Sequence, residues 1–288
     1  YLFQPPEIKE EIRYLSRIYW TSNRNVSIDE FAWDLWNLYF DRNIVESDYQ
    51  VSGESPVYGG IPREDPSRKR RFLQLLRNRG YWVGYDEALR NPAWVAYRLF
   101  DPTEEVSIPE RPDSFSPDER TTARVRSEDY TGSGFDRGHL APNFAIARCY
   151  GREAQEETFL MSNIVPQRHA LNAGPWKQLE SREAVNYPAR FREIWVITGP
   201  VFRKKLKRTL PSGIPIPDAF YKIYLDEFNG KVRTTAFLLE QDDDSGVVLE
   251  KRLCSITAIE ELTGLDFLPE LNEDVQKQLK AEPATRMW

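Results

Sequence analysis

The chain has 288 residues, of which 40% are hydrophobic and 29% charged, and its formal net charge is −6. This length suits a mixed α/β domain with a large core. No run of about 18 apolar residues suggests a transmembrane helix. An acidic chain argues against tight storage-type binding of nucleic acid, but not against an enzyme with a local cationic cleft.

The cysteine content also limits the class of protein. Cys149 and Cys254 are the only two cysteines, too few for a disulfide framework. Together with the two histidines, they do not have the spacing of a zinc site. We expect two buried or half-buried thiols, and a single disulfide between them stays open.

The first part of the chain has the hydrophobic spacing of helices. Ile12 and Leu15 follow a helical interval, and a second segment repeats it from Phe31 onward. We predict two packed helices here. They form an N-terminal helical extension of residues 1–50, followed by one domain over residues 51–288. The extension could modify substrate access, support dimerisation or pack on the domain.

Two basic runs stand out in this acidic chain. Residues 68–71 are all Arg or Lys and are predicted to open a helix, and residues 203–208 form a second run on a loop. Either run could be a solvated surface or a contact to phosphate. Within the second run, Lys204 and Lys205 are the candidates for contact with a nucleic-acid backbone.

Segments rich in aromatic and β-branched residues begin near residue 80. Residues 81–85 and 94–100 predict an antiparallel pair with a turn at Asn91-Pro92 between them. Residues 101–119 are rich in proline and acidic residues, which predicts a long loop. Later strands are predicted at Ile194–Thr198, Phe220–Leu225 and Val232–Leu239.

A further helix is predicted after these strands. Thr257 with Glu260 could form a capping box, and Gly264 could end the helix. The elements together predict an α+β fold, with a central antiparallel sheet flanked by helices.

The segment most informative about chemistry contains His139, preceded by Asp136, Arg137 and Gly138. Histidine suits a general base near neutral pH, because its ordinary pKa is about 6.5. Glycines around it permit a tight, irregular backbone. A lone histidine in a glycine-rich turn is more often structural, so the residues downstream decide its interpretation.

Those downstream residues are an amide and a carboxylate at a helix start. Pro175 suits the first helical turn, and Trp176 and Leu179 then face the core. Asn172 and Glu180 could face a cleft at the end of the helix. Magnesium keeps most of its waters and needs few protein ligands. Alternatively, Asn172 is a helix cap and Glu180 a surface charge.

The ordered set of motifs resembles the DNA/RNA non-specific endonucleases of the ββα-metal class, the group that includes endonuclease G. The tetrad Asp-Arg-Gly-His at 136–139 matches the family signature. Residues 162–180 match the second block of the family in order and spacing. The likeness extends over roughly residues 57–280, with further blocks at 198–200, 217–222 and 259–265.

This resemblance implies a role for each residue of the motif. His139 would be the general base that activates water, and Asn172 the sole direct protein ligand of one Mg²⁺ ion, with Mn²⁺ as an alternative. Glu180 would hold metal-bound water. Arg137 would contact phosphate or the leaving side, and Asp136 would orient the loop.

The resemblance implies further cationic contacts. Arg111 resembles a family arginine that stabilises the transition state. The family often places an arginine where this chain has Ala184, and Arg182 could substitute for it. His169, the second histidine, is expected to be a loop residue without a catalytic role.

The implied activity is endonucleolytic hydrolysis of DNA and RNA that leaves 5′-phosphate and 3′-hydroxyl ends. A catalytically weak nucleic-acid-binding relative and a phosphodiesterase of small nucleotides or exonuclease are the alternatives. A homodimer and an inhibitor protein are open as partners. Because an indiscriminate nuclease endangers its own cell, we expect a secreted, periplasmic or otherwise sequestered enzyme.

Overall fold

The fold is taken from a computed structural model of the chain. It describes residues 44–67, 72–102, 106–203, 208–228 and 230–288, with isolated positions at 9, 12–13, 16, 28–29 and 32. The isolated positions are helical. The predicted pair of N-terminal helices otherwise lies outside the described residues, as do the basic run at 68–71 and both Lys204 and Lys205.

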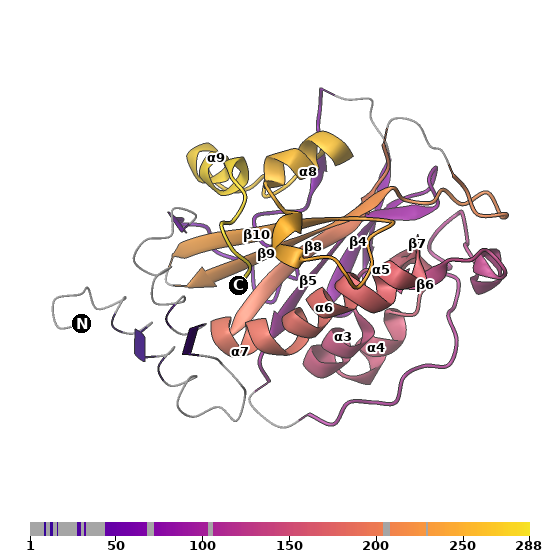
Figure 1. Cartoon of the computed structure of the whole chain (residues 1–288), viewed down its shortest axis with the longest axis horizontal. Coiled ribbons are helices and arrows are strands. Elements are labelled where there is room, and N and C mark those ends of the chain that lie inside the picture. Colours follow the sequence, from indigo (N-terminus) through magenta and orange to yellow (C-terminus); the bar gives the residue numbers. More distant parts are fainter. Residues whose placement is uncertain are drawn as a thin grey trace.

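The centre of the molecule is an antiparallel sheet, as predicted (Figure 1). A short strand, β11 (Leu253–Cys254), pairs with β10 beside its main path. The main path runs in the order β1 (Val45–Glu46), β10 (Lys231–Glu240), β9 (Ala219–Phe228), β8 (Glu193–Val201), β5 (Asn91–Phe100), β4 (Tyr81–Asp86) and β3 (Leu73–Arg77).

Helices cover both faces of this sheet (Figure 1). One face carries α3 (Asn143–Tyr150), α4 (Arg152–Glu157), α5 (His169–Leu171), α6 (Lys177–Ser181) and α7 (Tyr187–Phe191), and the other carries α8 (Ile256–Thr263) and α9 (Glu273–Ala281). Two small sheets lie outside the main one, β6 (Asp136–His139) with β7 (Ile164–Gln167), and β2 (Arg63–Glu64) with β12 (Leu265–Asp266).

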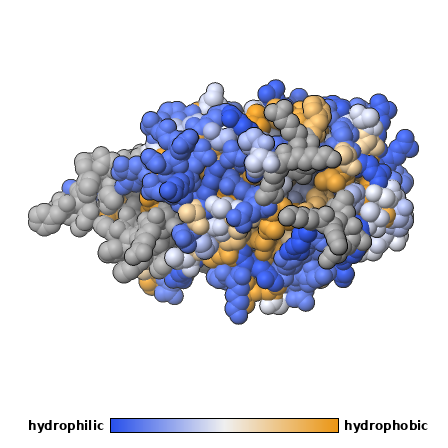
Figure 2. All heavy atoms as spheres, turned by 90° about the horizontal axis from the view of Figure 1, so that it is seen from above, coloured by the Kyte–Doolittle hydropathy of each residue, from blue (hydrophilic) through white to orange (hydrophobic). Residues whose placement is uncertain are grey.

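Strand β5 shows why the sheet is buried on both faces. Side chains alternate between the faces of a strand. Val95 and Tyr97 therefore join the core beneath α3–α7, whereas Trp94 and Ala96 join the core beneath α8 and α9. All four are at most 2% exposed. Hydrophilic residues dominate the outer face of the described residues in Figure 2, with hydrophobic ones in smaller patches.

Three sequence expectations are wrong in detail. The residues after the basic run form strand β3 at the sheet edge, not a helix. Asn91 and Pro92 begin strand β5, and the turn lies before them at residues 87–90. The cap of helix α8 is Ser255, whose Oγ accepts from Ala258 N at 3.1 Å, rather than Thr257.

Other expectations are confirmed. The three later strands lie at the predicted positions with slightly wider bounds. Gly264 ends helix α8 in the left-handed conformation, at φ 72°. Cys149 and Cys254 are half-buried free thiols. In the part of the chain that the structure describes, no helix combines the length and the apolar run that crossing a bilayer requires.

Candidate active site

The site is built on the hairpin of β6 and β7 together with the helical segment that follows it. His139 ends β6 opposite Ile164 of β7, so it lies on a strand and not in the glycine-rich turn that the sequence suggested. Gly138 permits the buried side chain of Gln167 to pack on the hairpin, because a Cβ there would lie 2.0 Å from Gln167 Oε1.

Asn163 holds the chain where it leaves β6. Its side-chain oxygen accepts from Ala141 N at 2.8 Å, and its amide donates to Ala141 O at 3.0 Å and Thr158 O at 2.9 Å. These bonds fix the connection between His139 and helix α3. The Ser-Asn-Ile motif that the sequence singled out is therefore a scaffold for the strand that carries His139.

Two aromatic rings enclose the imidazole of His139. The ring of Phe159 meets it edge-on at 5.0 Å between centroids, and the ring of Phe115 lies at 5.5 Å. Burial, and next the charge of Arg111, lowers the pKa of His139 to about 3. The imidazole is therefore neutral at pH 7. Its Nε2 atom is buried and makes no hydrogen bond within the described structure.

The helical segment that follows β7 is kinked at Gly174. The residue has φ −100° and ψ −113°, values outside the helical region, and Pro175 then starts the next stretch of helix. Asn172 lies just before the kink, within a helical segment that begins at His169, whereas the sequence placed it just before or at the start of the helix. Trp176 and Leu179 are fully buried in the core, as predicted.

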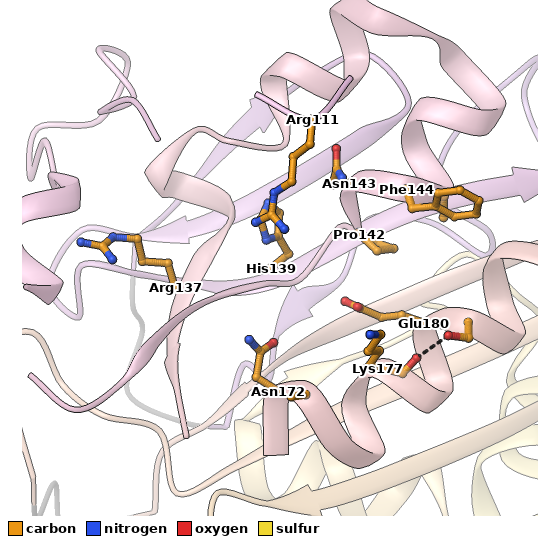
Figure 3. Close-up of a pocket in the computed structure, with 12 residues that line it drawn as sticks. Arg111, Arg137, His139, Pro142, Asn143, Phe144, Asn172, Lys177 and Glu180 are labelled. Carbon is orange, nitrogen blue, oxygen red and sulfur yellow. Dashed lines mark hydrogen bonds between the residues drawn. The ribbon is translucent and has the colours of Figure 1, made fainter. Parts of the chain in front are cut away.

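Hydrogen bonds join this helix to both ends of β6. Asn172 Nδ2 donates to Asp136 Oδ2 at 3.0 Å, and Trp176 Nε1 donates to His139 O at 3.2 Å. Because the amide nitrogen of Asn172 is bonded to Asp136, its oxygen is left for a ligand. Figure 3 shows this oxygen turned toward the side of Glu180 and Lys177. Asp136, which was expected to orient the loop, thus contacts Asn172 directly.

The same carboxylate oxygen of Asp136 has a second neighbour. His169 Nδ1 lies 2.8 Å from it, and the His169 side chain is 81% exposed. We expected His169 to be a loop residue without a catalytic role, but it is the first residue of helix α5. His169 and Asn172 thus contact the same oxygen atom of Asp136.

A cavity of about 440 Å³ opens between β6, α3 and α6 (Figure 3). It brings together His139, Asn172, Glu180, Arg111 and Arg137, all of which the sequence selected. Its other lining residues were not selected: Pro142, Asn143, Phe144, Ala145, Ala173, Lys177 and Ser181.

The charge state of Glu180 depends on its buried surroundings. Burial raises its pKa to about 7, Glu183 adds to the rise, and Lys222 opposes it. At neutral pH the carboxyl group therefore exchanges readily between its protonated and ionised forms. A cation in the cavity would favour the ionised form.

The arginines differ in how they face the cavity. Arg111 lies over the ring of Phe159, 5.3 Å from its centroid, and Figure 3 shows its guanidinium beside His139. Arg137 lines the cavity, but its Nη2 donates to Ser127 O at 2.6 Å, and Figure 3 shows its guanidinium turned away from His139. Arg182 is not among the residues that line the cavity.

A buried ion pair lies beneath the helical segment that carries Asn172 and Trp176, and we did not predict it from the sequence. Lys222 Nζ donates to both oxygens of Glu183, at 2.8 and 2.9 Å, and lies 4.7 Å from the centroid of the Trp176 ring. Tyr97 and Tyr224 also donate to Glu183, at 2.8 and 2.7 Å. The only feature of the sequence near Lys222 that could have indicated a buried ion pair is its place in the middle of a hydrophobic strand, β9.

Curated relatives of this chain are nucleases. It is 30% identical to mitochondrial endonuclease G of Homo sapiens over 69% of this chain and 71% of that protein. It is 31% identical to a nuclease of Serratia marcescens, over 73% of this chain and 80% of that protein. It is also 30% identical to mitochondrial nuclease EXOG of Xenopus laevis, over 67% of this chain and 57% of that one.

The fold has a counterpart among solved structures. A complex titled EndoG/EndoGI contains a chain that matches with a TM-score of 0.62 and 23% identity, over 71% of this chain and 88% of that one. The profile of the DNA/RNA non-specific endonuclease family matches residues 69–274, well over half of the chain. The chain therefore belongs to this family and is an enzyme, a nuclease that hydrolyses nucleic acids.

Proposed function

We propose that the chain is a sugar-non-specific endonuclease that hydrolyses phosphodiester bonds of DNA and RNA with His139 as general base. It uses one Mg²⁺-type ion, for which Mn²⁺ could substitute, and leaves 5′-phosphate and 3′-hydroxyl ends. One observation carries the proposal. The neutral His139 has a buried, unpartnered Nε2 atom in a cavity that Asn172 and Glu180 also line.

The geometry of His139 supports its role as base. A general base needs a free ring nitrogen within reach of the water whose proton it accepts. Phe115 and Phe159 hold the ring in place, and Trp176 bonds the main chain behind it. The imidazole can therefore take a proton at Nε2 without first losing one.

The donor atoms in the cavity fit a hard cation. Asn172 offers its amide oxygen, and Glu180 offers a carboxylate about two turns further along the helical segment. Among the described residues, no group of three or more His, Cys, Asp or Glu side chains could bind a metal ion. This suits an ion that keeps most of its waters, with Asn172 as direct ligand and Glu180 acting through water. When bound, such an ion neutralises charge on the phosphate and the leaving oxygen.

Arg111 and Lys177 supply positive charge to the cavity walls. Arg111 beside His139 is suited to stabilise the extra charge of the transition state. Arg137 lines the cavity while its Nε and Nη2 donate to Ser127 O, so we assign it to substrate contact at the edge of the site. Arg182, Lys204 and Lys205 remain proposed contacts to the nucleic-acid backbone beyond the cavity. Contacts to phosphate carry no sequence information, which suits a non-specific enzyme.

Plasmid cleavage tests the proposal. The purified protein should nick closed circular DNA with Mg²⁺ or Mn²⁺ and stop when EDTA is added, and it should also degrade a structured RNA. A strict exonuclease or a phosphodiesterase of small nucleotides would leave the closed circle intact. His139→Ala should lose at least about 100-fold in rate, the lower end for a lost general base. Activity that survives thorough chelation, or a near-normal rate of this variant, would refute the mechanism.

The chemistry of the ends needs its own assay. Cleaved fragments should be substrates for a DNA ligase without prior kinase treatment, because ligation requires a 5′-phosphate and a 3′-hydroxyl. If the fragments ligate only after removal of a 3′-phosphate and phosphorylation of the 5′ end, the enzyme leaves 5′-hydroxyl and 3′-phosphate ends instead.

Location, assembly and domain division are also proposals. Relatives are named as mitochondrial or come from bacteria, which supports an enzyme sequestered from cytosolic nucleic acid. A homodimer and an inhibitor protein are the proposed protein partners, and light scattering tests the first. Limited proteolysis tests whether residues 1–50 form an extension to a domain of residues 51–288.

A further inference from the structure

We propose that Phe144, with Asn143 beside it, forms a nucleobase subsite at one end of the cavity, where an unpaired base stacks on the phenyl ring. The inference rests on the proposed function, since it specifies which part of a nucleic-acid strand the site holds beside the phosphodiester. It predicts a nuclease that prefers bases free of their duplex partners.

The exposure of Phe144 is the first observation. Helix α3 buries Ala145, Ile146 and Ala147 in the core, whereas the Phe144 side chain on the opposite side is 47% exposed. Single exposed hydrophobic residues are common on protein surfaces. Of the large exposed hydrophobic side chains in the described residues, however, Phe144 alone lines the cavity that holds His139.

Its place in the cavity is the second observation. Figure 3 shows Phe144 and Arg137 at opposite ends of the site, with His139, Asn172 and Glu180 between them. A phosphate held near His139 therefore has a cationic side chain on one side and an aromatic ring on the other. A nucleotide matches this arrangement, because it joins a charged phosphate to a base with an apolar face.

Asn143 provides the third observation. Asn143 lines the same cavity, and its Oδ1 atom is buried and has no hydrogen-bond partner within the described structure. A buried acceptor without a partner is costly, so such an atom points to a ligand that supplies the hydrogen. The N–H groups of a base or the hydroxyl of a sugar can donate to it.

Stacking on phenylalanine suits a non-specific enzyme. Every base has a π face, so this contact adds affinity without reading sequence. A base in a duplex is already stacked and paired, and it must be extruded at a cost before it can reach a protein ring. The subsite should therefore favour single strands and the melted ends of duplexes.

The test compares two probes of equal length and charge. One is a short single-stranded oligothymidine, and the other is the same strand built from abasic units. The proposal predicts that the wild-type enzyme prefers the strand with bases in kcat/KM and in affinity measured by fluorescence anisotropy. Phe144→Ala should reduce that preference by about 5- to 150-fold, since removal of one stacking ring typically costs this much. Phe144→Trp should retain it, because the larger ring can stack.

A matched control separates stacking from general loss of surface. Phe72 is 81% exposed and is not among the residues that line the cavity, so Phe72→Ala should leave the ratio between the probes unchanged. Equal losses on both probes in Phe144→Ala, or no loss on either, would overturn the subsite while leaving the nuclease proposal in place. If the wild type cleaves neither probe, the nuclease proposal fails, and the anisotropy ratio still decides whether Phe144 binds bases.

Discussion

Trp176 donates its indole Nε1–H to the main-chain oxygen of His139 at 3.2 Å. The bond connects the helix that presents Asn172 to the strand that presents the proposed base. On the other side of the indole, Lys222 Nζ lies 4.7 Å from the ring centroid. Trp176 thus contacts both the strand that carries His139 and the buried ion pair of Lys222 and Glu183.

Trp176→Phe tests this relationship. The variant keeps an aromatic ring in the core but removes the hydrogen bond to His139. We expect the free energy of unfolding to fall by about 1 kcal/mol, as for a typical hydrogen bond. We also expect kcat to fall more than KM rises, because the strand that carries the base loses its support. Urea denaturation and steady-state kinetics on an oligonucleotide measure the two effects.

Trp195→Phe is the matched control. Trp195 Nε1 donates to Ser55 O at the same distance, 3.2 Å, in the core on the other face of the sheet. This variant should lose similar stability and keep kcat. If both variants lose kcat in proportion to their stability, the bond from Trp176 has no special role in the site.

The bond between Asn172 and Asp136 predicts how metal affinity depends on each residue. Asn172→Ala removes the proposed direct ligand and should weaken Mn²⁺ binding at least about tenfold. Asp136→Ala keeps the ligand but releases its amide nitrogen. It should weaken binding less than Asn172→Ala does, and by at most about 100-fold, the upper end of the range typical of groups that orient ligands. Isothermal titration with Mn²⁺ measures both.

A control for this pair is His169→Ala, which removes the other neighbour of Asp136. The His169 side chain is 81% exposed and is not among the cavity lining, so its loss should change metal affinity less than the loss of Asp136. Unchanged affinity in Asn172→Ala would reject the assignment of this amide as the ligand.

The buried ion pair predicts a large effect on stability. Glu183 and Lys222 are both fully buried. Glu183→Ala leaves the ammonium of Lys222 buried without its counter-charge, which should cost about 3 to 5 kcal/mol. The control is Glu156→Ala, which breaks an exposed pair with Arg152 and should cost below about 1 kcal/mol. Similar costs for the two variants, measured by urea denaturation, would show that Lys222 finds another partner or water.

Local pattern was enough to predict the later strands and the helical stretch that begins at Pro175. Strands β8, β9 and β10 are rich in aromatic and β-branched residues, which favour strands with a buried face. Pro175 marks the start of a helical stretch, and the spacing of Trp176 and Leu179 marks its buried side. These features depend on neighbours within one or two turns, which a sequence displays directly.

Features that depend on distant partners were not predicted. Strand β3 follows a basic run and becomes a strand because β4 pairs with it. The partner of Lys222 is 39 residues away, on a helix. Phe144 could be a core residue by its hydrophobicity, and only the packing of α3 leaves it at the cavity. In each case the deciding contact joins elements that are separate in the sequence.

The burial of His139 predicts a pH dependence of stability. In the folded protein its pKa falls from an ordinary value of 6.5 to about 3, mainly because burial disfavours the imidazolium ion. Below pH 6.5 the unfolded chain therefore binds a proton that the folded chain does not. As the pH is lowered from 6.5 to about 3, the free energy of unfolding decreases. This residue alone contributes up to about 1.4 kcal/mol per pH unit. His139→Gln cannot take up this proton, so its metal-free stability should decline less steeply between pH 6.5 and pH 4. Urea denaturation in EDTA across that range measures the two slopes, and equal slopes would mean that the imidazole reaches solvent and protonates in the folded state.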